Sequence, residues 1–140
     1  MFREDYIIRL IRQFADFVAK LVGLREKGEF EQAITEAGKG WDELLGHPRT
    51  LVDVTDTPML AALLKEPAKM RIAAQLLIEE GHAHKGKGDP VHAVMCYRRA
   101  FELYLEARAA APEPDDNAAI AELGRLVPPT QLDARYRSAP

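Results

Sequence analysis

The sequence predicts an all-α fold of two helical hairpins, joined by a short helix and closed by a C-terminal capping helix. Residues that favour helices occupy most positions, aromatic residues make up only 7% of the chain, and alternating strand patterns are nearly absent. A Lys-Gly-acid elbow at 27–29 recurs at 87–89, and each copy is followed by an alanine and a β-branched residue at the same offset. Each elbow lies between two apolar helical patterns, as expected of a repeated pair of helices.

Length and composition limit the classes of protein to which this chain can belong. Its 140 residues predict a single domain over 1–127 and a flexible tail over 128–140, beginning at a double proline. A net charge of −3 gives no electrostatic case for binding nucleic acid. The single cysteine cannot form a disulfide within the chain, so a reducing cytoplasm is the expected compartment. No cofactor-binding motif is present, and we expect no cofactor.

The first predicted helix, 2–24, has more apolar surface than one neighbouring helix can cover. A polar stripe interrupts its apolar sequence: Arg9, Arg12, Asp16 and Lys20. A spanning helix needs about 20 mostly apolar residues, so membrane insertion is not expected. The apolar arc covers roughly 200°, whereas the usual core-facing stripe is only about 100° wide. This helix is therefore either sandwiched between layers of the fold or part of an oligomer interface. We predict a homo-oligomer, with a dimer as the first expectation, and an interface formed by Ile8, Ile11, Ala15, Ala19 and Val22.

Glycine and proline set the remaining boundaries. The expected helices are 29–45, 57–65, 67–85, 90–111 and 114–126, with a loop over 46–56. Gly40 inside the second helix predicts a close approach of the first helix, because a glycine there costs about 1 kcal/mol relative to alanine. Trp41, Tyr97 and Tyr104 lie at helical spacing, so we expect them in the core rather than in a ligand cage.

The second elbow resembles a tetratricopeptide repeat. The matching positions are small or aromatic residues around a Gly-Asp turn: Gly81, Gly88, Asp89, Ala93, Tyr97 and Ala100. The chain as a whole is similar to short bacterial tetratricopeptide-like proteins of unknown function, through residues 4–13, 23–28 and 103–107. Leu21 and Glu80 depart from the repeat pattern. The resemblance implies a repeat-like helical fold and supplies no activity.

Such stacked hairpins bind partner segments in a concave groove lined by their first helices. Mapped onto this chain, the groove consists of Val18, Val22, Arg25, Glu26, Gln75, Ile78, His82 and Lys85. Its apolar floor and mixed charge suit a protein segment better than a small metabolite. The alternative is that these residues only pack within the chain. The favoured function is a non-enzymatic protein-interaction module that self-associates or binds a partner segment.

A rival hypothesis is a metal-binding sensor or enzyme built on His82, His84, His92 and Cys96. His92 and Cys96 lie four residues apart on one helix, a spacing at which two side chains can share a metal ion. His82 and His84 are two apart and point to different sides of their helix. Because the ligand set is incomplete, the sequence favours solvated histidines and a boundary cysteine, with His92 and Cys96 as the weak metal candidates. No motif for nucleophilic catalysis is present, so we predict no catalytic residues.

Overall fold

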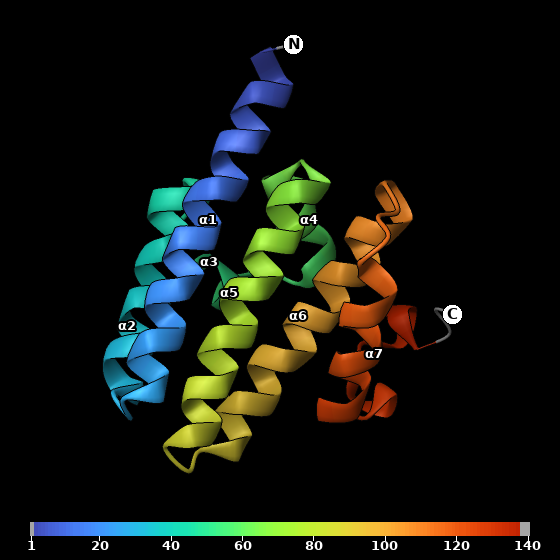
Figure 1. Cartoon of the computed structure of the whole chain (residues 1–140). Helices are drawn as coiled ribbons and strands as arrows, with labels where there is room; N and C mark the ends of the chain where they lie inside the picture. The colour runs from blue at the N-terminus through green and yellow to red at the C-terminus, as the bar shows by residue number, and fades with distance from the viewer. Residues whose placement is uncertain (1, 138–140) are drawn as a thin grey trace.

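The part of the chain that the structure describes is mostly helical. The computed structural model describes residues 2–137, with side chains from Glu4 onward, and contains seven α-helices and no strand in that range. They are α1 (Phe2–Glu26), α2 (Phe30–Gly40), α3 (Leu51–Val54), α4 (Thr57–Leu64), α5 (Pro67–Gly86), α6 (Pro90–Ala110) and α7 (Asp116–Leu126). A π-helical turn, η1 (Trp41–Leu45), continues α2, and two 3-10 turns, η2 (Pro129–Gln131) and η3 (Ala134–Tyr136), follow α7. The predicted all-α class is confirmed (Figure 1).

The two elbows share one backbone geometry. Gly28 and Gly88 adopt the left-handed conformation, with φ of 77° and 86°, which glycine reaches without steric cost. In both elbows the glycine N–H donates to the carbonyl three residues earlier, and the next N–H donates to the carbonyl five residues earlier. These distances are 3.0 and 2.9 Å at the first elbow and 3.1 and 2.9 Å at the second. Two hairpins result, α1–α2 and α5–α6. Their likeness to tetratricopeptide repeats stays a prediction.

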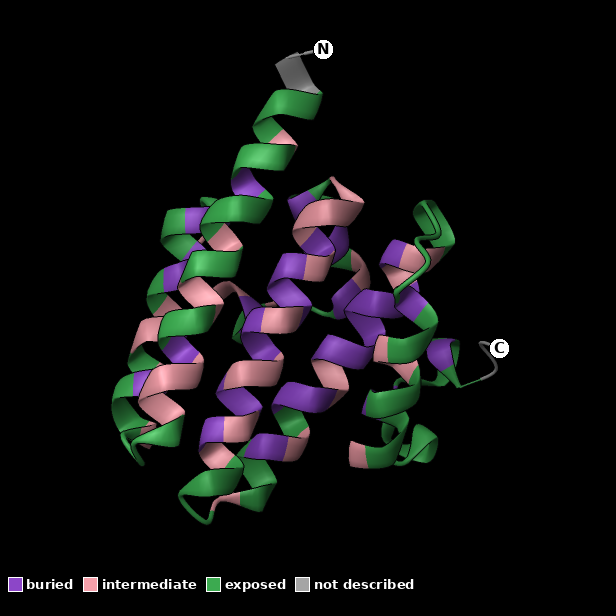
Figure 2. Ribbon diagram, in the orientation of Figure 1, coloured by how far each residue is buried: buried purple, intermediate pink, exposed green. Residues whose placement is uncertain are grey.

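Helix α5 lies at the centre of the fold, in contact with α1, α2, α4 and α6. Ala73, Ala74, Leu76 and Leu77 on this helix are completely buried. Figure 2 shows that buried residues concentrate on α5 and α6, while the first turns of α1 are mostly exposed. The first turns of α1 also project beyond the other helices (Figure 1). The second hairpin therefore forms the core, and α1 covers one of its sides.

Small residues allow two helix pairs to approach closely. A Cβ atom on Gly40 would lie 2.9 Å from Cε1 of Phe17, so the predicted close approach of the first helix is confirmed. A Cβ atom on Gly81 would lie 2.6 Å from Cε1 of Tyr97. Trp41 and Tyr97 are buried, at 0% and 2% exposure, as expected for core residues. Tyr104 is buried as well.

The linking segment is more structured than predicted. The expected loop over 46–56 contains α3, so two short helices, α3 and α4, join the hairpins. Asp56 caps α4, because its side chain accepts a hydrogen bond of 2.9 Å from the N–H of Met59. The hydroxyl of Thr57 donates to the buried carboxylate of Glu102, at 2.5 Å.

The C-terminal segment packs on the domain, in contrast to the flexible tail predicted over 128–140. Leu132 and Tyr136 are buried, at 2% and 7% exposure. The N–H of Asp133 donates to Glu102 at 2.9 Å, and the hydroxyl of Tyr136 donates to Glu106 at 2.6 Å. Residues 138–140 of the predicted tail lie outside the described residues. The segment over 129–137 is therefore part of the domain rather than an appendage.

Candidate functional site: the second elbow and the outer face of the first helix

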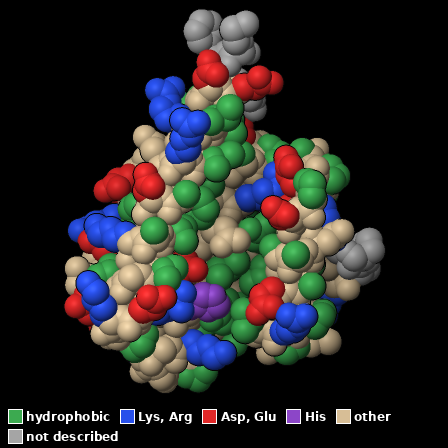
Figure 3. All heavy atoms as spheres, in the orientation of Figure 1, with side chains coloured by type: hydrophobic (Ala, Val, Ile, Leu, Met, Phe, Trp, Pro, Cys, Tyr) green, Lys and Arg blue, Asp and Glu red, His purple; other side chains and the backbone are tan. Residues whose placement is uncertain are grey.

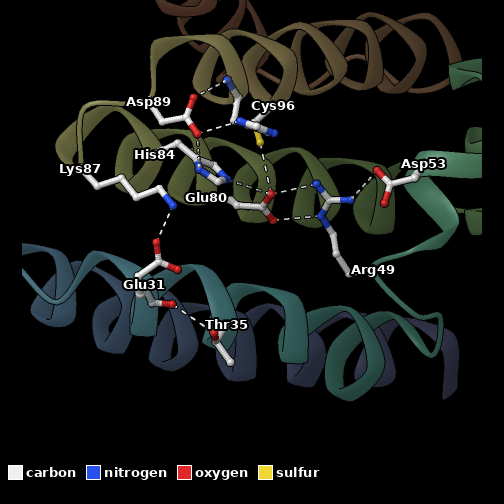
Figure 4. A network of polar contacts seen from close by, with 10 residues as sticks. Glu31, Thr35, Arg49, Asp53, Glu80, His84, Lys87, Asp89 and Cys96 are labelled. Carbon is white, nitrogen blue, oxygen red and sulfur yellow. Dashed lines mark hydrogen bonds and ion pairs between the residues drawn. The ribbon is translucent and has the colours of Figure 1, made fainter.

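The second elbow brings four potential ligand side chains together. Glu80 and His84 lie one turn apart at the end of α5, and His92 and Cys96 lie one turn apart at the start of α6. The side chain of Asp89 caps α6 by accepting a hydrogen bond of 3.2 Å from the N–H of His92. This cap and the glycine turn before it fix the two helix ends side by side. Figure 4 shows the resulting network around Glu80.

Glu80 is the centre of that network. Its carboxylate is 5% exposed and accepts two hydrogen bonds from the guanidinium of Arg49, at 2.9 and 2.8 Å. The Cys96 thiol donates to the same carboxylate at 3.3 Å, and Nε2 of His84 lies 3.7 Å from it. Burial alone would lower the pKa of Arg49, but the hydrogen bonds and charge of Glu80 raise it above its usual value. Arg49 and Glu80 therefore form a charge-balanced buried pair.

Cys96 is unsuited to act as a nucleophile in this state. Burial raises the pKa of its thiol well above the usual range, and the charge of Glu80 raises it further. Since the thiolate is the reactive form, a thiol held protonated is chemically inert near neutral pH.

The two histidines of the cluster differ in environment. His84 and His92 stack, with ring centroids 5.3 Å apart. Burial lowers the pKa of His84, which keeps its ring neutral near pH 7. His92 is largely exposed, and its Nδ1 lies 2.7 Å from a carboxylate oxygen of Asp89. Hydrogen bonds from His92, first of all from its backbone N–H, lower the pKa of Asp89.

His82 does not join this cluster, although it belonged to the predicted set. Its Nδ1 lies 2.7 Å from the Tyr97 hydroxyl, and its pKa is lowered mainly by burial. The structure groups His84, His92 and Cys96 and adds Glu80 and Arg49, which the metal hypothesis did not include. The signal for Glu80 was present, because it replaces an apolar residue of the repeat pattern.

A cavity of about 370 Å³ opens beside the cluster. Arg49, Glu80, His84 and Cys96 line it, together with Arg98 and Arg99. The Arg99 guanidinium donates to the carbonyl oxygens of Val52 and Thr55, at 3.1 and 2.9 Å. Burial lowers the pKa of Arg99. The cluster is therefore reachable from solvent on the side that carries cationic side chains.

The predicted partner groove is only partly assembled. Gln75, Ile78 and His82 line a pocket of about 210 Å³. Its opposite wall comes from α7, through Ala119, Glu122, Leu123 and Leu126, which sequence reasoning had placed only in a capping helix. From α1, Val18, Val22 and Arg25 are half-buried, and Arg25 forms an ion pair of 3.3 Å with Glu79. Glu26 and Lys85 are exposed. Binding of a partner segment there stays a prediction.

The predicted oligomer interface is left uncovered within the chain. Ile8 and Ile11 are 51% and 49% exposed, and Ala15 and Ala19 are also exposed. Val22 is half-buried. On the other side of the same helix, Leu10 and Leu21 are buried against the domain. Figure 3 shows apolar side chains gathered along α1 and in the hollow beside it.

Comparisons of the chain with protein-family models, with curated proteins and with solved structures found no match. The resemblance to tetratricopeptide-like proteins therefore stays a prediction. Within residues 2–137, no helix has both the length and the apolar character needed to cross a bilayer.

Proposed function

We propose that this chain is a non-enzymatic interaction module that associates with a second copy of itself through the outer stripe of α1. The outer stripe is the set Ile8, Ile11, Ala15, Val18, Ala19 and Val22. The observation that carries the proposal is the exposure of Ile8 and Ile11, each about half, on a helix whose opposite side is already buried. A buried free thiol at Cys96 suits a reducing compartment, and the cytoplasm is the location proposed.

The spacing of the outer stripe matches a helix–helix seam. Ile8, Ile11, Ala15, Val18 and Val22 follow one another at intervals of three, four, three and four residues. This is the heptad spacing that keeps one face of a helix directed at a partner helix. A second copy of α1 supplies a surface with the same spacing. A closed pair with two-fold symmetry then covers the N-terminal part of both stripes, around Ile8 and Ile11, at once.

Charge favours an antiparallel pair. Asp5 and Arg12 lie two turns apart, so both lie along the same edge of the stripe. In a parallel pair this edge of the stripe faces the opposite edge of the partner's stripe, so Asp5 and Arg12 of the two copies do not meet. In an antiparallel pair Asp5 faces Arg12 of the second copy. The remaining helices of the two copies then lie at opposite ends of the helix pair. The projection of the first turns of α1 leaves room for that arrangement (Figure 1).

The expected effect of disrupting the stripe follows from its exposure. Covering the exposed half of each isoleucine contributes about 1 kcal/mol. Two isoleucines in each of two copies then contribute about 4 kcal/mol, which corresponds to a dissociation constant raised about a thousandfold. We expect the wild type to sediment as a dimer at micromolar concentration and the variant Ile8→Glu/Ile11→Glu as a monomer.

A matched control separates this interface from surface charge in general. Val54 and Val91 are 76% and 67% exposed on other elements, and Val54→Glu/Val91→Glu should remain dimeric. The register is tested by Asp5→Arg, which should weaken the dimer, and by Asp5→Arg/Arg12→Asp, which should restore it. A monomeric wild type would refute the proposal, as would a control variant that dissociates equally.

A further inference from the structure

We propose that Glu80, His84 and Cys96 bind a zinc ion, and that this ion displaces Arg49 from Glu80. The three residues supply one oxygen, one nitrogen and one sulfur ligand, and these atoms all lie within 4.8 Å of one another. This grouping is the only one of its kind found among the described residues. The site is independent of the α1 interface.

The ligand spacing fits tetrahedral zinc. Zinc bonds to oxygen, nitrogen and sulfur measure about 2.0–2.3 Å, so neighbouring ligand atoms in a tetrahedron lie about 3.5 Å apart. The separation from Glu80 is 3.3 Å for the Cys96 sulfur and 3.7 Å for Nε2 of His84. One separation is slightly shorter and the other slightly longer than the distance expected between two ligands of a tetrahedral zinc ion. Two of the three ligand separations are therefore already close to those of a tetrahedral site, and the third pair, Cys96 and His84, lies within 4.8 Å.

Charge balances in both states of the site. Without zinc, the carboxylate of Glu80 is neutralised by Arg49, and Cys96 carries its proton. With zinc, the carboxylate and a Cys96 thiolate together neutralise the divalent ion, while His84 contributes a neutral ring. Binding thus exchanges one zinc ion for one proton and one guanidinium. Neither state leaves an uncompensated buried charge, which would be costly.

Arg49 has a second carboxylate within reach. Its guanidinium already donates to Asp53 at 3.3 Å, and the Asp53 side chain is largely exposed. Arg49 lies between η1 and α3, outside both elements. It can therefore leave Glu80 while keeping Asp53 as its partner. Figure 4 shows Arg49 between these two carboxylates.

A supporting carboxylate lies behind the histidine. Nδ1 of His84 is buried without a hydrogen-bond partner among the described residues, and a carboxylate oxygen of Asp89 lies 4.0 Å from it. In metal sites the nitrogen opposite the ligating one usually donates to such a carboxylate, which fixes the ring. A small rotation of His84 makes that bond while Nε2 faces the ion. Glu80, His84 and Cys96 all line the cavity, so a water from the cavity would take the fourth position.

The test measures metal binding directly on the untagged full chain. We expect stoichiometric Zn²⁺ in competition with a chromophoric chelator, and a sulfur-to-metal charge-transfer band when Co²⁺ replaces Zn²⁺. Cys96→Ser should abolish the band and weaken binding by about a hundredfold or more. His82→Ala is the matched control, because His82 lies outside the cluster, and it should bind as the wild type does.

The variant Arg49→Gln tests whether the Arg49 guanidinium competes with zinc for Glu80, an effect that a purely structural cluster would not show. Removing the competing guanidinium should tighten Zn²⁺ binding by about tenfold or more, although the metal-free variant is less stable because Glu80 is unpaired. Zn²⁺ should then restore the melting temperature of Arg49→Gln but not that of Arg49→Gln/Cys96→Ser. The absence of stoichiometric binding by the wild type would overturn the proposal. Weaker binding by Arg49→Gln would also overturn it, as would binding that His92→Ala abolishes and His84→Ala does not.

Discussion

One substitution, glycine to alanine, should have opposite effects at two helical positions of this fold. Gly38 lies inside α2, and a Cβ atom there would meet nothing closer than Cβ of Arg49, at 3.9 Å. Since alanine favours a helix over glycine by about 1 kcal/mol, Gly38→Ala should stabilise the protein by about 0.5–1 kcal/mol. Nothing in the structure explains the glycine at this position.

Gly81 lies inside α5, where the same methyl group has no space. A Cβ atom there would lie 2.6 and 2.9 Å from two ring carbons of Tyr97, about 1 Å closer than ordinary carbon contacts. The ring cannot retreat easily, because Tyr97 is 2% exposed and its hydroxyl is bonded to His82. Overpacking costs about 1–3 kcal/mol, which exceeds the gain in helix propensity. We expect Gly81→Ala to destabilise the protein by about 1–2 kcal/mol.

Urea denaturation followed by circular dichroism measures both effects as changes in the free energy of unfolding. In thermal melts each kcal/mol should shift the midpoint by about 3 °C. Adding Tyr97→Leu to Gly81→Ala removes the ring that is overlapped, so the two substitutions should couple favourably. Equal stability of wild type and Gly81→Ala would refute the close-packing argument, as would shifts of the same sign at Gly38 and Gly81.

Two further predictions concern the C-terminal half. Hydrogen bonds from Arg71 lower the pKa of the Asp116 carboxylate in the folded protein. The ionised carboxylate therefore stabilises the folded state at pH values above about 4, which is the ordinary pKa of an aspartate in an unfolded chain. This stabilisation is lost as the pH falls through the lower pKa of Asp116 in the folded state. Asp116→Asn should therefore cost about 2 kcal/mol at neutral pH and flatten the acid limb of the unfolding free energy; an unchanged acid limb would contradict this. Truncation after Pro128 removes the buried Leu132 and Tyr136 and should cost about 3 kcal/mol, whereas an unchanged melting temperature would support the flexible tail predicted from sequence.

The features that sequence could predict are those set by local backbone chemistry. Both elbows were identified because a glycine in the left-handed conformation and an acid at the start of a helix are properties of a few consecutive residues. The surplus apolar arc of α1 could be predicted for the same reason, because the spacing of apolar residues is a property of a single helix. The crossing at Gly40 followed from a glycine placed where a helix would otherwise disfavour it.

The features that sequence missed depend on pairs of residues that lie far apart. Arg49 and Glu80 meet only because α3 and α4 return the chain to α5, and no local pattern near Arg49 indicates a buried partner. The wall of the groove contributed by α7 is equally non-local. Leu132 and Tyr136 lie in a proline-rich segment without helical periodicity, so their burial depends on a tertiary surface that α6 completes.

The outer stripe of α1 is an apolar helix face that the described residues leave largely exposed. Helix α5 carries apolar residues on several sides and contacts α1, α2, α4 and α6, so its apolar surface is covered within the chain. Helix α1 also carries surplus apolar surface, and its main contacts among the described residues are with α2, α5 and the short η1 turn. Repeat folds bury such faces against a neighbouring helix. The proposed dimer supplies such a helix from a second copy of α1, whose stripe has the same spacing and whose Asp5 and Arg12 carry opposite charges.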